Sequence, residues 1–241
     1  MVSLPAPARS SGTLSPQVPP TVTSLTHTLQ DLGWARIQAS GNEDELLKIA
    51  SNLGTIVHQA SRPQLSRLTP IVSVAAAPNT ASESYGTGRF PYHTDLAQWP
   101  KPPRYLIMGN ATGTSTIPTL LLDSQNLALQ AELDRKISQA LWKITKTKRP
   151  FVCGMTLTGS TTLGMRWDSN VMQPLNGPAL EITNQLIQTL EDQATPNEVQ
   201  FDWSEPGTIL VLDNWRMLHA RPAVPENQNS RTLYRVFAAE Y

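Results

Sequence analysis

Two short stretches that lie far apart in the chain constrain its fold and chemistry more than any other part of the sequence: residues 90–95 and residues 213–219. The first ends in His-Thr-Asp and the second ends in His219. Because side chains alternate between the two faces of a strand, His93 and Asp95 are expected on the same face of an extended segment. Two imidazoles and one carboxylate around Fe(II) leave open coordination positions on one side of the ion. The sequence therefore predicts a metal site that joins two distant strands.

A His-x-Asp pair alone is a weak signal, because it occurs by chance in many proteins. Here the distant histidine follows a hydrophobic strand and bend at residues 207–214, and Arg231 follows that histidine by 12 residues. Arg231 fits a return strand beside the metal, where its planar guanidinium can form a bidentate pair with a carboxylate. Arg235 lies four residues further on, so on a strand it shares a face with Arg231. The combination is much more specific than the pair.

The composition excludes several classes of protein. The chain has 19 basic and 19 acidic residues, and this balance gives no electrostatic footprint for nucleic acid or an anionic membrane. Cys153 is the only cysteine, so an internal disulfide is impossible and a reducing, cytoplasmic location is expected. No apolar run approaches the roughly 18–20 residues that a membrane span needs. We therefore expect neither a nucleic-acid partner nor a membrane partner.

The chain divides into two parts of unequal length. Residues 1–24 are rich in Pro, Ser and small residues, lack the pattern of a secretory signal, and are expected to form a flexible tail. Residues 25–241 show no internal repeat and no second composition regime. A chain of this length can bury a substantial core, so we expect one domain after the tail.

Segments with the pattern of strands outnumber those with the pattern of helices. We expect helices at residues 43–53, 126–144 and 178–192, and strands at residues 33–38, 56–58, 71–74, 104–108, 116–122, 208–212 and 232–238. Many short strands with few helices are typical of a mainly β (α+β) protein with a sandwich or barrel-like core. The long polar run at residues 77–89 leads into the His-Thr-Asp stretch and is predicted to form a binding lid.

The layout resembles the taurine dioxygenase / clavaminate synthase-like family of Fe(II)- and 2-oxoglutarate-dependent dioxygenases. The matching segments occur in family order and are residues 92–95, 102–106, 118–121, 213–219 and 231–235. The resemblance covers roughly residue 30 to the C-terminus. It implies a single double-stranded β-helix (jelly-roll) domain with flanking helices.

The resemblance also implies a role for individual residues. His93, Asp95 and His219 would bind Fe(II), and 2-oxoglutarate and O2 would be the cosubstrates. Arg231 would pair with the C5 carboxylate of 2-oxoglutarate, assisted by the hydroxyl of Thr119. The expected reaction is hydroxylation, with succinate and CO2 as co-products.

The carboxylate at position 95 bears on the outcome of that reaction. Related halogenases have Gly or Ala at this position, which opens a site for chloride, whereas Asp95 fills it. Hydroxylation is therefore favoured over halogenation. Desaturation, epoxidation and ring closure stay open, because they use the same oxidising chemistry.

The sequence describes the substrate less closely than the metal. Arg235 and Arg166 suggest a small anionic molecule that bears a carboxylate, such as an amino acid or an amino acid-derived metabolite. Tyr92 and Trp215 are further candidates for the wall of the substrate pocket. For Arg166 and Arg221 an ion pair or solvent contact fits the sequence equally well. Nothing in the sequence defines the oligomeric state.

Two functions of other classes fit parts of the pattern. A non-catalytic jelly-roll protein that binds metal as a sensor fits the three ligands, but it has no need for a cosubstrate clamp at Arg231. A zinc hydrolase fits the same three ligands. It leaves both Arg231 and Thr119 unexplained.

Overall fold

The computed structural model describes residues 22–58, 63–77, 80–113, 115–127, 135–159, 163–191, 197–225 and 232–240. Within these residues the protein is mainly β with few helices, as the sequence predicted. Most of the predicted tail lies outside the described residues and stays a prediction, while residues 22–24 belong to the first helix. No helix among the described residues is long and apolar enough to cross a bilayer.

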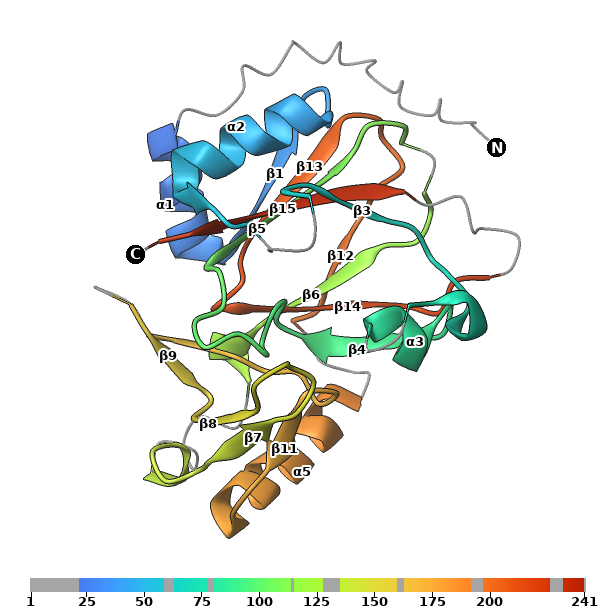
Figure 1. Ribbon diagram of the computed structural model, residues 1–241. Helices are drawn as coiled ribbons and strands as arrows, with labels where there is room; N and C mark the ends of the chain where they lie inside the picture. The colour runs from blue at the N-terminus through green and yellow to red at the C-terminus, as the bar shows by residue number, and fades with distance from the viewer. Residues whose placement is uncertain are drawn as a thin grey trace, which may run out of the picture.

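Two antiparallel sheets, one above the other in Figure 1, form the centre of the molecule. The larger has the order β1 (Trp34–Gln38), β13 (Thr208–Asp213), β5 (Tyr105–Asn110), β15 (Leu233–Ala239) and β2 (Thr55–Ile56), and β3 (Ser66–Leu68) also pairs with β15. The smaller has the order β12 (Val199–Phe201), β6 (Thr119–Asp123), β14 (Met217–Arg221) and β4 (Phe90–His93). Neighbouring strands in both sheets come from distant parts of the chain.

Two helices, α1 (Val22–Leu32) and α2 (Glu43–Leu53), cover the outer face of the larger sheet. The helix predicted at residues 43–53 is confirmed, and its cap has the expected chemistry. The side chain of Asn42 accepts a hydrogen bond from the backbone N–H of Glu45 at 3.0 Å. At the other end the N–H of Gly54 bonds to the carbonyl of Ala50. Local sequence signals therefore fix this helix at both ends.

A smaller lobe packs against the outer face of the smaller sheet. It contains the sheet β11 (Met172–Pro174), β7 (Trp142–Ile144) and β8 (Phe151–Cys153), the hairpin β9 (Thr156–Thr158) and β10 (Leu163–Met165), and helix α5 (Gly177–Glu191). Trp142 is completely buried in the shared core and donates its indole N–H to the hydroxyl of Thr183 at 3.0 Å. The helix predicted at residues 178–192 is confirmed as α5.

Three predicted elements differ from the structure. Within the predicted helix 126–144, residues 128–134 lie outside the described residues and residues 142–144 form strand β7. Its burial alternates, with Trp142 and Ile144 inside and the lysine between them outside, so period two prevails over the helical spacing. Residues 71–74 are not a strand, because a short 3-10 helix begins at Ser73. The predicted loop 77–89 contains a short helix, α3 (Ala81–Tyr85).

The alternation of side chains divides the molecule into layers. On β5, Tyr105 and Ile107 contact the helices, whereas Leu106 and Met108 face the space between the two sheets. On β14, Leu218 faces the small lobe. The faces that the two sheets turn away from the helices and the small lobe thus enclose one inner space. The candidate site lies in this space.

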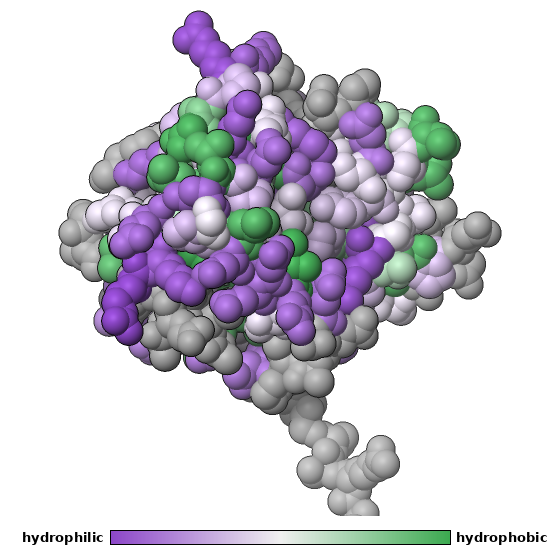
Figure 2. Space-filling model, turned by 90° about the horizontal axis from the view of Figure 1, so that it is seen from below, coloured by the Kyte–Doolittle hydropathy of each residue, from purple (hydrophilic) through white to green (hydrophobic). Residues whose placement is uncertain are grey.

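The surface shows no single dominant apolar area on the face seen in Figure 2. Apolar residues there form small, separate groups among hydrophilic ones. The most exposed large apolar side chains of the described residues are Val74, at 97% exposure, and Leu163, at 76%.

We predict that Leu46→Ala lowers the free energy of unfolding by about 2–5 kcal/mol. Leu46 is completely buried between α2 and β5, where the missing side chain of Gly109 lets it approach the sheet. Urea unfolding followed by circular dichroism measures the change. Lys48→Ala, at an exposed position of the same helix, is the control and is expected to change stability by less than about 0.5 kcal/mol. Equal effects of the two substitutions would contradict the packing described for α2.

Candidate metal centre

The two histidines predicted as metal ligands lie opposite each other on paired strands. His93 ends β4, and its antiparallel partner on β14 is His219. Their ring centroids are 4.2 Å apart. The register therefore brings together two residues that are 126 positions apart in the sequence.

Asp95 completes the group by a different route from the one that the sequence suggested. Strand β4 ends at His93, and Asp95 lies in the turn that follows, so a continuous strand does not explain its position. The carboxylate nonetheless lies 3.8 Å from Nε2 of His93 and 3.8 Å from Nε2 of His219. All three ligand atoms lie within 4.8 Å of one another, and all three residues are buried.

The geometry of the group fits a bound metal ion. Separations of 3.8 Å are too long for hydrogen bonds, yet one ion about 2.0–2.2 Å from each atom can bridge them. The carbonyl of Pro91 lies 3.0 Å from Nδ1 of His93, which directs Nε2 towards the shared centre. A second histidine and a carboxylate complete a donor set that suits divalent iron.

The charges around the site keep the ligands in the forms that bind metal. Burial raises the pKa of Asp95, but Arg235 and the two histidines outweigh burial, so the pKa lies below its usual value. Nη1 of Arg235 lies 3.1 Å and 3.0 Å from the two carboxylate oxygens. Burial, His93 and Arg235 lower the pKa of His219 to about 3, against a smaller opposing effect of Asp95. Asp95 is thus ionised and His219 neutral at pH 7, as metal binding requires.

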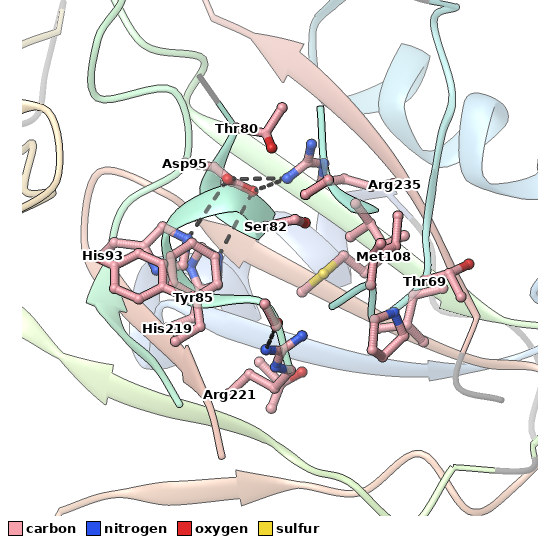
Figure 3. Close-up of a pocket in the computed structure, with 18 of the residues that line it drawn as sticks. Thr69, Thr80, Ser82, Tyr85, His93, Asp95, Met108, His219, Arg221 and Arg235 are labelled. Atoms are coloured by element: carbon pink, nitrogen blue, oxygen red, sulfur yellow. Dashed lines mark hydrogen bonds and ion pairs between the residues drawn. The ribbon is translucent and has the colours of Figure 1, made fainter. Parts of the chain in front are cut away.

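A cavity of about 510 Å³ opens beside the three ligands (Figure 3). Arg235, Arg221 and Thr119 line it together with apolar side chains such as Met108 and Leu233. Asp95 is the only acidic residue among the described lining residues. The cavity therefore has a metal centre at one end and a positively charged, partly apolar wall.

The structure places two of the three residues that the sequence suggested for binding the cosubstrate or the substrate carboxylate. Thr119 lies on β6 at the cavity, and its hydroxyl accepts a hydrogen bond from the indole N–H of Trp203 at 2.9 Å. Arg235 lies on β15 at the cavity, where it holds Asp95 and stacks over the ring of Phe237. Arg231 lies outside the described residues, so the structure does not place it.

Three of the predicted substrate residues do not line the cavity. Tyr92 is buried on the opposite face of β4, where its hydroxyl bonds to the carboxylate of Glu198. Trp215 donates its indole N–H to the carbonyl of Pro102 at 3.0 Å. Arg166 donates to three backbone carbonyls of residues 97–100. Tyr92 thus belongs to the core shared with the small lobe, whereas Trp215 and Arg166 hold the backbone near the site.

The predicted lid contributes to the cavity through α3 and the residues around it. Tyr85 of α3 lines the cavity, and its ring lies 4.9 Å from that of Phe90, which in turn stacks on His93 at 4.1 Å. Arg221 donates to the carbonyls of Gly86 and Gly88 at 2.7 Å and 2.8 Å. This arginine, two residues after His219, thus fastens the segment that follows α3 to β14.

Sequence reasoning did not single out Asn214, although it lies within the motif that pointed to His219 and contacts Asp95. Its buried side-chain amide bonds to both the N–H and the carbonyl of Asp95. No pattern in the sequence reports a side chain that contacts distant backbone. The available signal was its place at the bend after a buried strand.

Comparison with known proteins agrees with the predicted family. The model of the family described as taurine catabolism dioxygenase TauD, TfdA family matches residues 126–237, which include His219 but neither His93 nor Asp95. No curated protein sequence matches the chain.

Solved structures share the fold over most of their length. Asparagine oxygenase in complex with Fe(II), 3-hydroxyasparagine and succinate is 14% identical with a TM-score of 0.67, covering 90% of this chain and 78% of that one. The non-haem iron oxygenase OrfP in complex with Fe is 17% identical with a TM-score of 0.67, covering 88% and 76%. The same enzyme with Fe and alpha-ketoglutaric acid is 17% identical with a TM-score of 0.63, covering 88% and 77%.

We predict that the metal-free protein loses stability as the pH falls from about 6.5 to 4.5. The unfolded chain binds a proton at His219 near pH 6.5, whereas the folded protein keeps it neutral down to about pH 3, so acid favours unfolding. This group contributes up to about 1.4 kcal/mol per pH unit in that range. Urea unfolding in the presence of a chelator, repeated across the range, measures the slope.

His219→Ala is expected to make this slope shallower. The control is Leu233→Ala, which also removes a buried side chain from the cavity wall but no titrating group. It should lower stability and keep the wild-type slope. Identical slopes for the wild type and His219→Ala would show that burial does not hold His219 neutral.

Proposed function

We propose that this chain, of which residues 126–237 match the TauD/TfdA family model, is an Fe(II)- and 2-oxoglutarate-dependent dioxygenase that hydroxylates a small, carboxylate-bearing substrate. The observation that carries the proposal is the convergence of His93, Asp95 and His219 within 4.8 Å at the wall of a positively charged cavity. Succinate and CO2 are the expected co-products. A cytoplasmic location, in keeping with the single cysteine, is part of the proposal.

The proposed architecture is a double-stranded β-helix with flanking helices. Two facing antiparallel sheets with strands from distant parts of the chain support it. The inner faces of β14 and β15 supply His219 and Arg235, which is how such a core presents a site between its sheets. We propose that residues 25–241 form this single domain.

In this proposal His93, Asp95 and His219, which line the cavity, would hold the iron. Bound iron and 2-oxoglutarate supply the oxidising chemistry, in which O2 is consumed and the cosubstrate is decarboxylated. The protein holds Asp95 ionised through Arg235 and keeps His219 neutral by burial. Both effects favour metal over protons at the ligands.

The proposed cosubstrate site combines Thr119 with Arg231. Thr119 lies at the cavity, and its hydroxyl, which accepts a hydrogen bond from the indole N–H of Trp203, is the group proposed to contact a carboxylate oxygen of the cosubstrate. The role of Arg231 rests on its spacing from His219 in the sequence. Bidentate pairing with the C5 carboxylate is the interaction that an arginine forms best.

The substrate is proposed to be an amino acid or an amino acid-derived metabolite. Asparagine oxygenase is described in complex with 3-hydroxyasparagine, and OrfP in complex with (3S)-hydroxy-L-Arg, so both structural neighbours bind hydroxylated amino acids. Arg235 offers a guanidinium at the cavity, and its Nε has no hydrogen-bond partner among the residues that the structure describes. A carboxylate of the substrate is the group that such a wall would attract.

We predict that the protein forms succinate from 2-oxoglutarate only when Fe(II) is present. His93→Ala should abolish turnover, because it removes one of three metal ligands. Arg231→Ala should raise the apparent KM for 2-oxoglutarate at least tenfold, because the far carboxylate loses its bidentate partner. Arg149→Ala, at an exposed position between β7 and β8, is the matched control and should leave both kinetic constants unchanged. Turnover that survives His93→Ala would refute the proposed function.

We further predict that free L-amino acids stimulate 2-oxoglutarate consumption more than the corresponding amines that lack the carboxylate. The cationic cavity wall attracts the carboxylate, and the amine presents only a positive charge to it. Succinate formation measured across amino acid and amine pairs tests this. An amine that stimulates as strongly as its parent amino acid would show that the enzyme does not recognise a carboxylate.

A further inference from the structure

The carboxylate ligand lies on an unfavourable stretch of backbone. Leu96, directly after Asp95, has a φ of +57°, the only positive φ of a residue other than glycine in the part of the chain that the structure describes. This left-handed region is disfavoured for a leucine, because the side chain crowds the following carbonyl. Such a conformation persists only where the surroundings determine it, and functional sites are where it is usually found.

Asn214 holds the residue that precedes this strained position. Its Oδ1 accepts a hydrogen bond from the N–H of Asp95 at 2.7 Å, and its Nδ2 donates to the carbonyl of Asp95 at 2.9 Å and to that of Pro103 at 3.0 Å. The side chain is completely buried. The Asn214 amide thus satisfies both the N–H and the carbonyl of Asp95, as a neighbouring strand does for a residue within a sheet.

A second buried side chain holds the other end of the turn. Arg166 donates to the carbonyls of Ala97, Trp99 and Pro100 at 3.3, 2.6 and 2.8 Å. No acidic side chain pairs with this guanidinium among the described residues. Its hydrogen bonds therefore serve the backbone of the turn, on the far side of Leu96 from Asn214.

The three metal ligands differ in how the fold positions them. His93 and His219 lie on paired strands, whose register fixes them. Asp95 lies beyond the end of β4 and has no strand partner for its backbone. The Asn214 amide supplies both backbone hydrogen bonds of that residue instead, and it lies at the bend that leads into the strand carrying His219.

We propose that Asn214 is a positioning residue for the metal centre, which fixes the Asp95 carboxylate against the strained turn before any metal binds. The proposal deepens the proposed function and rests on it only in requiring that the site binds a divalent metal. Loss of the amide should free the turn at Leu96, so the carboxylate moves away from the two histidines. Metal affinity should then fall although every ligand is present.

The test measures Co(II) binding to the metal-free protein, followed by the visible absorption of the bound ion. Asn214→Asp keeps the shape and the acceptor but loses both donated hydrogen bonds, and Asn214→Ala removes all three. Both variants should bind Co(II) about 10–100-fold more weakly than the wild type, the range typical of residues that orient metal ligands. The absorption spectrum of the Co(II) complex should change as well, because the carboxylate no longer approaches in the same geometry.

Asn110 provides a matched control. It is a buried asparagine whose amide donates to the carbonyl of Trp203 at 2.8 Å and accepts from the N–H of Gly113 at 3.0 Å. It does not line the cavity. Asn110→Ala should lower folding stability yet leave the Co(II) dissociation constant within about twofold of the wild type and the spectrum unchanged.

A measurement on the unmodified protein keeps the test decisive if Asn214→Ala fails to fold. In the metal-free wild type, the amide of Asp95 should exchange its hydrogen slowly, because it is bonded to a buried side chain. Rapid exchange of that amide would overturn the proposal. So would Asn214 variants that bind Co(II) as the wild type does, or Asn110→Ala weakening Co(II) binding by the same factor. A wild type that binds no Co(II) would instead refute the proposed function.

Discussion

The antiparallel pairing of β4 with β14 is the interaction on which the rest of the site depends. It sets His93 opposite His219, and it does so with backbone hydrogen bonds that need no particular side chains. The alternation of side chains along each strand then decides which residues face the cavity between the two sheets. Thr119 on β6 and Arg235 on β15 face inward with His219, while Leu218 and Leu120 face the small lobe. The register of β4 with β14 thus pairs the two histidines, and the alternation of side chains separates the cavity from the core of the small lobe.

Electrostatics gives the same inner space a preference for anions. Arg235 neutralises Asp95, so the pair contributes no net charge, and His219 is neutral because it is buried. A divalent ion added to this arrangement leaves an excess of positive charge, to which Arg221 adds. Such an excess in a poorly solvated cavity is relieved by bound carboxylates. The charge balance therefore supports the proposal that the cosubstrate and the substrate are both anionic.

The sequence predicted that His93, Asp95 and His219 come together, because their spacing reports chemistry directly. It also predicted helix α2, since a capping asparagine and a terminal glycine are local signals. Tyr92 was assigned to the pocket although alternation on the strand that carries His93 turns it to the other face, so that error was avoidable. Arg166 and Trp215 offered no such signal, because their partners are backbone carbonyls set by tertiary structure. The end of the predicted helix 126–144 was wrong because the apolar residues there fit the helical period of 3.6 and the strand period of two equally well.

Asp95 lies beside the two histidines as the sequence predicted, but for a different reason from the one that the spacing suggested. The His-x-Asp spacing suggested a continuous strand, yet the strand ends at His93 and the chain turns through a left-handed Leu96. The carboxylate converges with the histidines because Asn214 and Arg166 hold the turn on either side of that residue. Asn214 and Arg166 lie far from Asp95 in the sequence, so no local sequence pattern predicts how this turn is held. Two buried side chains are thus used to hold a turn that places the carboxylate 3.8 Å from each histidine and 3.0 Å from Arg235.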